Sequence, residues 1–224
     1  MNATRRITLI AMFTSLAITT DYALTPINNV KLVFTLVFAS AYSFGFKVGA
    51  AVAVLAELIW GIISPDGFGG LIIPFLMGAT LIYAVVGWGA SKVWGTEINP
   101  VSPLNIVFGC IMATCAFAWD TVTNLATGLL ALWPDNVTLS HLLFFEVNPL
   151  TLYFMISHEL SDFIIGSALT PIMIVYFLRV FGQREDQLSK MKQYLLGTTQ
   201  IQEKGISELT SWSCKNQHME LSQF

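Results

Sequence analysis

Charged residues are scarce in this chain of 224 residues: 11% are Asp, Glu, Lys or Arg, whereas 54% are hydrophobic. The mean hydropathy is +0.66. One water-soluble core of this length does not bury so much apolar surface, so a soluble domain is excluded. An excess of basic residues is also lacking, since the formal net charge is -3, and this argues against nucleic acid as a partner. The composition therefore predicts an integral, multi-pass protein of the cell membrane.

Cysteine and the common catalytic motifs are also sparse or missing. Of the three cysteines, Cys110 and Cys115 share an apolar segment at an angle that prevents bonding, and Cys214 lies in a polar tail. Neither a disulfide framework nor a zinc spacing follows. The sequence contains no Gly-x-x-x-x-Gly-Lys-Ser/Thr loop and no Gly-x-Ser-x-Gly elbow. We therefore predict no enzymatic activity, no cofactor and no bound metal.

The apolar runs predict an all-α bundle of six transmembrane helices. They cover residues 7–24, 30–46, 49–63, 71–93, 104–133 and 149–181. Residues 1–182 form one predicted transmembrane domain. Residues 183–224 form a polar cytoplasmic tail, partly helical or disordered, because their composition changes to Gln, Ser, Thr, Glu and Lys.

The basic residues predict the orientation of these spans. With both termini in the cytoplasm, six basic residues lie at cytoplasmic ends and Lys31 alone lies outside. The six are Arg5, Arg6, Lys47, Lys92, Arg179 and Arg184. The opposite orientation inverts that ratio, so cytoplasmic termini are predicted.

The most unusual segment is His158-Glu159-Leu160-Ser161-Asp162, which lies inside the last apolar run. Each charged side chain costs roughly 2.5–3.5 kcal/mol at mid-membrane on insertion scales, so three titratable groups in five residues point to a ligand or proton site. On a helix His158, Glu159 and Asp162 fall within one arc of about 100°. The alternative is a paired cluster that only holds helices together.

Other polar residues are predicted in the outer half of the membrane, as His158 is. With a rise of about 1.5 Å per residue, Glu57 lies roughly 15 Å along the third span and Asp120 roughly 24 Å along the fifth. Asn124 belongs to a polar stripe that begins at Asp120 and recurs at three- and four-residue steps. We therefore expect these residues to surround one polar cavity in the outer half of the membrane, suited to a cationic or amine-bearing solute.

The same segment is open to three other interpretations. An intramembrane metallohydrolase needs His-Glu-x-x-His, and the second imidazole is missing from His158-Glu159-x-x-Asp162. A transition-metal ion on His158, Glu159 and Asp162 is disfavoured by the single imidazole and the absence of a usable thiolate. An ion- or proton-coupled secondary transporter is the stronger alternative, although the sequence has no internal repeat of the kind such carriers often show.

Several segments, in this order, resemble the S components of energy-coupling factor vitamin transporters, and in particular archaeal members with unassigned substrates. The resemblance covers about residues 5–182. The segments that carry it are Asp-Tyr-Ala-Leu at 21–24, Pro-Ile-Asn-Asn-Val-Lys-Leu at 26–32, Phe-Gly-Phe-Lys-Val-Gly-Ala at 44–50, Trp-Gly at 60–61, Pro-Asp-Gly at 65–67, Asp-Thr-Val-Thr-Asn at 120–124 and His-Glu-Leu-Ser-Asp at 158–162.

The resemblance implies a subunit that captures a vitamin-like solute near the outer face, under loops between its helices. It implies three protein partners, namely a membrane coupling subunit and two cytoplasmic ATPases. Asn29 and Lys31 are then expected in a loop that covers the solute. In the family an Ala-x-x-x-Ala pair in the first span docks on the coupling subunit. The matching positions are Ala11 and Ser15, where serine replaces the second alanine and is still small enough for close approach.

Overall fold

The computed structural model describes residues 2–27, 29–65, 67–95, 98–99, 102–132 and 138–181. The predicted tail at 183–224 lies outside these residues. Contacts divide the chain into two units, Met1–Phe177 and Leu178–Phe224. Only 178–181 of the second unit is described, and it is helical.

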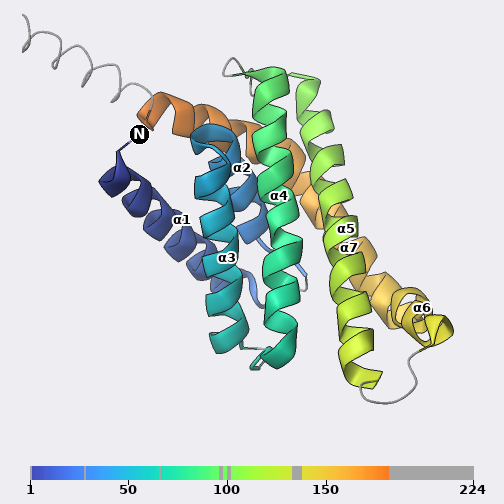
Figure 1. Ribbon diagram of the computed structural model, residues 1–224. Helices are drawn as coiled ribbons and strands as arrows, with labels where there is room; N and C mark the ends of the chain where they lie inside the picture. Colours follow the sequence, from blue (N-terminus) through green and yellow to red (C-terminus); the bar gives the residue numbers. More distant parts are fainter. Residues whose placement is uncertain are drawn as a thin grey trace, which may run out of the picture. The chain divides into compact units, whose positions relative to one another are not determined.

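The regular structure of the described residues is entirely helical (Figure 1). Its labelled elements are α1 (Ala3–Leu24), α2 (Val33–Phe44), α3 (Phe46–Ile63), the 3-10 turn η1 (Gly70–Ile72), α4 (Ile73–Trp94), α5 (Leu104–Leu132), α6 (Leu139–Val147) and α7 (Pro149–Ala168). A further helical segment, Thr170–Phe181, is bent by 43° from α7. The predicted all-α class is thus confirmed.

Among the described residues, four helices are long and apolar enough to cross a membrane: α1, α3, α4 with η1, and α5. The bent pair Pro149–Ala168 and Thr170–Phe181 makes a fifth candidate if it counts as one span. The sixth expected span corresponds to α2, which has 12 residues. A helix of that length rises only about 18 Å, less than the apolar thickness of a bilayer. A multi-pass membrane protein is supported, whereas the count of six and the sidedness of the ends stay predictions.

The short helix α2 is enclosed by its neighbours. Every residue from Val33 to Tyr42 is buried, and α2 packs against α3, α4, α1 and α7. Its sequence, Val-Phe-Thr-Leu-Val-Phe-Ala-Ser-Ala-Tyr-Ser-Phe, is apolar on all sides, which is typical of a helix buried on all sides. The first unit is therefore organised around α2.

The longer helices surround this core. In Figure 1, α3, α4 and α5 run next to one another, and α1 lies obliquely beside α3. The most extensive contact joins α5 and α7. The unpredicted helix α6 begins after the capping hydroxyl of Thr138 and ends at Asn148, whose side chain in turn caps α7.

Glycines allow the central helices to approach closely. Gly45 has φ of +92°, a conformation that lets α2 turn directly into α3. Gly87 on α4 lies against the backbone of Phe38 on α2, where a Cβ atom would be 2.5 Å from the Phe38 carbonyl oxygen. Gly49 on α3 approaches Ala41 in the same way. Small residues therefore set the spacing of the core helices.

Candidate functional site

A pocket of about 350 Å³ opens where α1 ends, next to the connection that leads into α2. This volume lies at the lower end of the range usual for small-molecule sites. Its walls come from the end of α1, the following connection, α3 and α7. The lining residues are Asp21, Leu24, Thr25, Ile27, Asn29, Val30, Lys31, Trp60 and Phe154. A small solute with both apolar and polar groups fits such walls.

Asn29 ties the connection between α1 and α2 to α7. Its Nδ2 donates to the carbonyl oxygen of Phe154 at 2.7 Å, and its own carbonyl accepts from Ser161 Oγ at 3.3 Å. Asn29 has φ of +58°, a region that Asn tolerates better than most residues. The pocket wall is thus held by one residue suited to its backbone conformation.

Replacing Asn29 with alanine is expected to loosen this wall more than replacing it with glycine. Both changes remove the bond to Phe154, worth about 1 kcal/mol, but only alanine also carries the cost of positive φ, about 1 kcal/mol more. Hydrogen exchange of residues 25–32 should therefore rise in the order wild type, Asn29→Gly, Asn29→Ala. Equal exchange in all three proteins would show that Asn29 does not hold the wall.

Asp21 has a structural role at the edge of the pocket. Its Oδ1 accepts from the backbone N–H groups of Leu32 at 3.0 Å and Val33 at 3.3 Å. These groups begin α2, which has no capping side chain of its own. A carboxylate from α1 thus satisfies donors that a helix start leaves open, and its charge complements the helix dipole.

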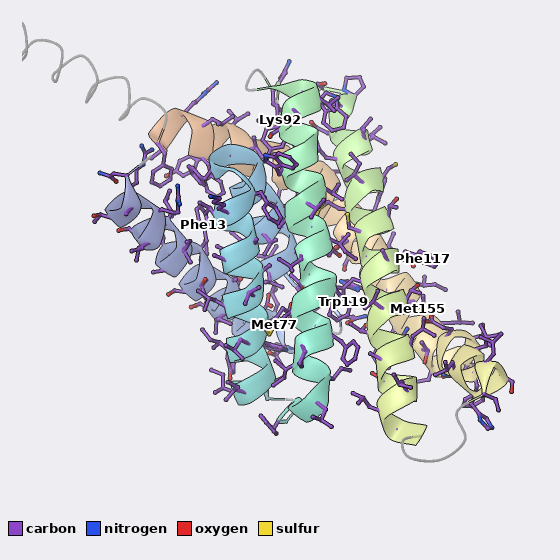
Figure 2. All side chains as sticks on the ribbon, in the orientation of Figure 1. Phe13, Met77, Lys92, Phe117, Trp119 and Met155 are labelled. Atoms are coloured by element: carbon purple, nitrogen blue, oxygen red, sulfur yellow. The ribbon has the colours of Figure 1, made fainter. Side chains whose placement is uncertain are left out.

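Lys31 lies between two tryptophan rings at the pocket. Its Nζ is 5.3 Å from the ring centroid of Trp60 on α3 and 5.7 Å from that of Trp119 on α5. The Trp119 Nε1–H donates to Thr80 Oγ1 on α4 at 2.9 Å, so its side chain reaches from α5 toward α4 (Figure 2). Thr80 Oγ1 in turn donates to Glu57 Oε1 at 2.9 Å. A chain of contacts therefore runs from the pocket to a buried carboxyl group.

A second buried polar pair lies beyond Trp119. His158 Nδ1 is 2.9 Å from Asp120 Oδ2, and the imidazole is only 1% exposed. The Tyr83 hydroxyl donates to Asp162 Oδ2 at 2.7 Å, and Asp162 is fully buried. The other polar atoms of the two groups, His158 Nε2 and Asp162 Oδ1, have no hydrogen-bond partner among the residues that the structure describes.

Phe34 of α2 joins these polar groups through its ring. It stacks on Tyr83 with centroids 4.7 Å apart and lies 5.3 Å from Trp119 and 5.0 Å from His158. Trp119 also contacts His158 edge-on at 5.4 Å. Apolar rings thus fix the buried polar side chains, which excludes water and strengthens their hydrogen bonds.

The predicted site residues separate into three groups. Asn29 and Lys31 line the pocket. Four others lie buried in the network next to it: Glu57, Asp120, His158 and Asp162. Glu159 and Asn124 are only partly buried and do not line the pocket. His158 and Asp162 therefore share the inward face of α7 that the 100° arc predicted, whereas Glu159 lies at the edge of that face.

Asn124 lies near α6 rather than in the pocket. Burial raises the pKa of the Glu146 carboxyl on α6, the Asn124 side chain opposes this shift, and the negative charge of Asp120 adds to it. Glu146 is partly exposed, at the end of α6. Asn124 thus connects the polar stripe of α5 to the segment that precedes α7.

Asp21, Trp60 and Tyr83 have roles in the structure that their sequence positions do not show. Asp21 stands near the end of an apolar run, and nothing in the sequence reveals that it caps a helix whose first residue, Val33, lies twelve residues later. The sequence alone favours an ordinary packing or membrane-interface role for Trp60, and nothing in it distinguishes Tyr83 from the other tyrosines. The spacing of Trp60, three residues after Glu57 and hence on the same helical side, was the available signal.

The described residues contain no group of three or more His, Cys, Asp or Glu side chains placed to hold a metal ion. Ala11 and Ser15 are both exposed on α1, away from the helices packed against it. No protein-family model, no curated protein and no solved structure matches the chain.

Proposed function

We propose that this protein is the solute-capturing membrane subunit of an importer of the energy-coupling factor type. It binds a vitamin-like small molecule in the pocket beside Lys31 and Trp60 and has no catalytic activity of its own. The observation that carries the proposal is a pocket lined by both polar and apolar residues, next to a buried polar network. It lies in a chain whose helices are long and apolar enough to span a membrane. Such a pocket is the usual form of a small-molecule site.

Several features support the division of labour with other subunits. The sequence has no nucleotide-binding loop, so ATP hydrolysis belongs to the two cytoplasmic ATPases. The exposed pair Ala11 and Ser15 offers a small-residue surface on α1, as close helix docking in a membrane requires. The solute pocket lies at the other end of α1, which fits an outer face if the amino terminus is cytoplasmic.

The experiment that tests the proposal enlarges these small residues. Ala11→Leu with Ser15→Leu is expected to lower recovery of the coupling subunit and ATPases with this chain at least about tenfold, because bulk prevents close approach of helices. Leu16→Phe is the control, since it adds bulk on an exposed side of α1 about 100° from Ser15. The measurement is the amount of coupling subunit and ATPases that co-purifies with the tagged full chain from membranes of cells that express all four subunits.

A second candidate function has its own observation. A proton relay in a secondary transporter requires titratable side chains buried between the helices. The chain has four such groups in hydrogen-bonded pairs: His158 with Asp120, and Tyr83 with Asp162. The two functions make opposite predictions in sealed vesicles that contain this chain alone. Solute accumulation driven by a proton or sodium gradient, together with unchanged co-purification of the leucine variant, would overturn the importer proposal in favour of the second.

A further inference from the structure

We propose that the Lys31 ammonium group occupies a cation site that the solute fills with its own ammonium group. This inference rests on the proposed function and specifies its solute as a small organic ammonium compound. Lys31 then acts as a resident cation that leaves when the solute arrives.

The rings provide a site that is selective for cations. Trp60 and Trp119 come from different helices, and both are at least nine-tenths buried. Their centroids lie 5.3 and 5.7 Å from Lys31 Nζ. A cation within about 6 Å of a tryptophan face is attracted by the ring quadrupole, most strongly where water is excluded. Two such faces form part of the cage that commonly binds organic ammonium ligands.

The charges near Lys31 favour a cationic solute over an anionic one. Lys31 is the cation whose charge acts on both Asp21 and Glu57. It is also the one Lys or Arg among the residues that line the pocket. The other base in the network, His158, is engaged with Asp120. An anionic solute would draw Lys31 away and add negative charge beside two carboxyl groups, whereas exchange of one ammonium for another keeps the charge balance.

Lys31 is placed so that it can leave. It follows the non-helical connection after α1 and is only partly buried. Its ammonium sits on a flexible four-carbon stem. The remaining walls suit the body of an organic ammonium compound, because Leu24, Ile27 and Phe154 are apolar. The pocket therefore accepts a small amine with an apolar body that takes the place of the lysine head group.

The chain contains a matched control for this contact. Lys92 Nζ lies 5.8 Å from the ring of Trp88 on α4, but both residues are exposed, and within the described part of the chain no second ring contacts Lys92. This pair has the same chemistry as Lys31 and Trp60 without the pocket. Lys92→Met thus removes a lysine–tryptophan contact and leaves the proposed site intact.

The test compares three probes of nearly equal shape on the full chain in lipid nanodiscs. Choline carries a quaternary ammonium, 3,3-dimethylbutan-1-ol replaces its nitrogen with carbon, and 3,3-dimethylbutanoate is an anion. Titration calorimetry should show choline binding at least about tenfold more tightly than the other two, as a desolvated cation–ring contact predicts. Lys31→Met should bind choline more tightly than the wild type because the resident cation is gone. Lys92→Met should bind it as the wild type does.

Acetylation of Lys31 in the wild type gives a second readout that needs no variant. Choline should raise the acetylation of Lys31, measured by peptide mass spectrometry, because the displaced amine becomes accessible. The inference would be overturned if 3,3-dimethylbutanoate bound more tightly than choline, lost its binding in Lys31→Met and protected Lys31 from acetylation. That outcome would leave the pocket as a solute site and the proposed function standing. Failure of choline to bind Lys31→Met at millimolar concentration would also overturn the inference.

Discussion

His158→Leu is expected to lower the free energy of unfolding by about 3 kcal/mol, because it leaves the Asp120 carboxyl buried without its partner. Asp120 is only 6% exposed, and the 2.9 Å bond to His158 is the side-chain contact that compensates its burial. Thermal or denaturant unfolding of the purified protein in one detergent gives the measurement.

A second variant separates the pair from the bulk of the side chains. His158→Leu with Asp120→Leu should recover most of the lost stability, because two apolar groups replace the pair and no charge stays buried. Glu159→Gln is the matched control on the same helix, and its partly exposed side chain predicts a change below about 0.5 kcal/mol. A double variant less stable than His158→Leu alone would contradict this account of the network.

Gly87→Val is expected to lower the free energy of unfolding by about 3 kcal/mol. A Cβ at this position meets the Phe38 carbonyl oxygen at 2.5 Å and its carbonyl carbon at 3.1 Å. These are backbone atoms, so α2 and α4 must separate rather than a side chain rotate. Gly87→Ala should have a smaller effect of the same sign, and the unfolding midpoint measures both.

The control for this prediction lies two residues further along α4. A Cβ at Gly89 meets no heavy atom within 4 Å, so Gly89→Ala should change stability by less than about 1 kcal/mol, in the stabilising direction. Equal losses from Gly87→Ala and Gly89→Ala would show that the contact between α2 and α4 does not set the spacing of the core.

The sequence predicts the long helices well and the short ones poorly. The apolar run at 71–93 closely matches α4, and the start at Leu104 matches the first residue of α5. The run at 30–46 instead contains a buried 12-residue helix, because apolar content does not distinguish lipid-facing residues from residues packed against protein. The helix α6 falls between two predicted spans and was not predicted, since nine residues give too weak a periodic signal.

The site was predictable in its residue types but not in its arrangement. Charge in an apolar run identified His158 and Asp162, and helical spacing gave them a common face. Sequence spacing does not show that Tyr83, 79 residues away, donates to Asp162. It also does not show that Asp21 caps the helix starting at Val33 or that Lys31 lies between two tryptophans, because tertiary contacts create these roles.

The central claim is that the pocket lined by Lys31 and Trp60 captures a solute. Native mass spectrometry of the protein released from its own membranes tests this claim most directly. The account predicts one small molecule per chain in the wild type, its loss from Trp60→Leu, and its retention by Trp88→Leu, in which the exposed tryptophan of α4 is replaced. Unfolding curves that match across the three proteins exclude a general loss of structure. A wild type that carries no solute, or a solute retained by Trp60→Leu, would contradict the account.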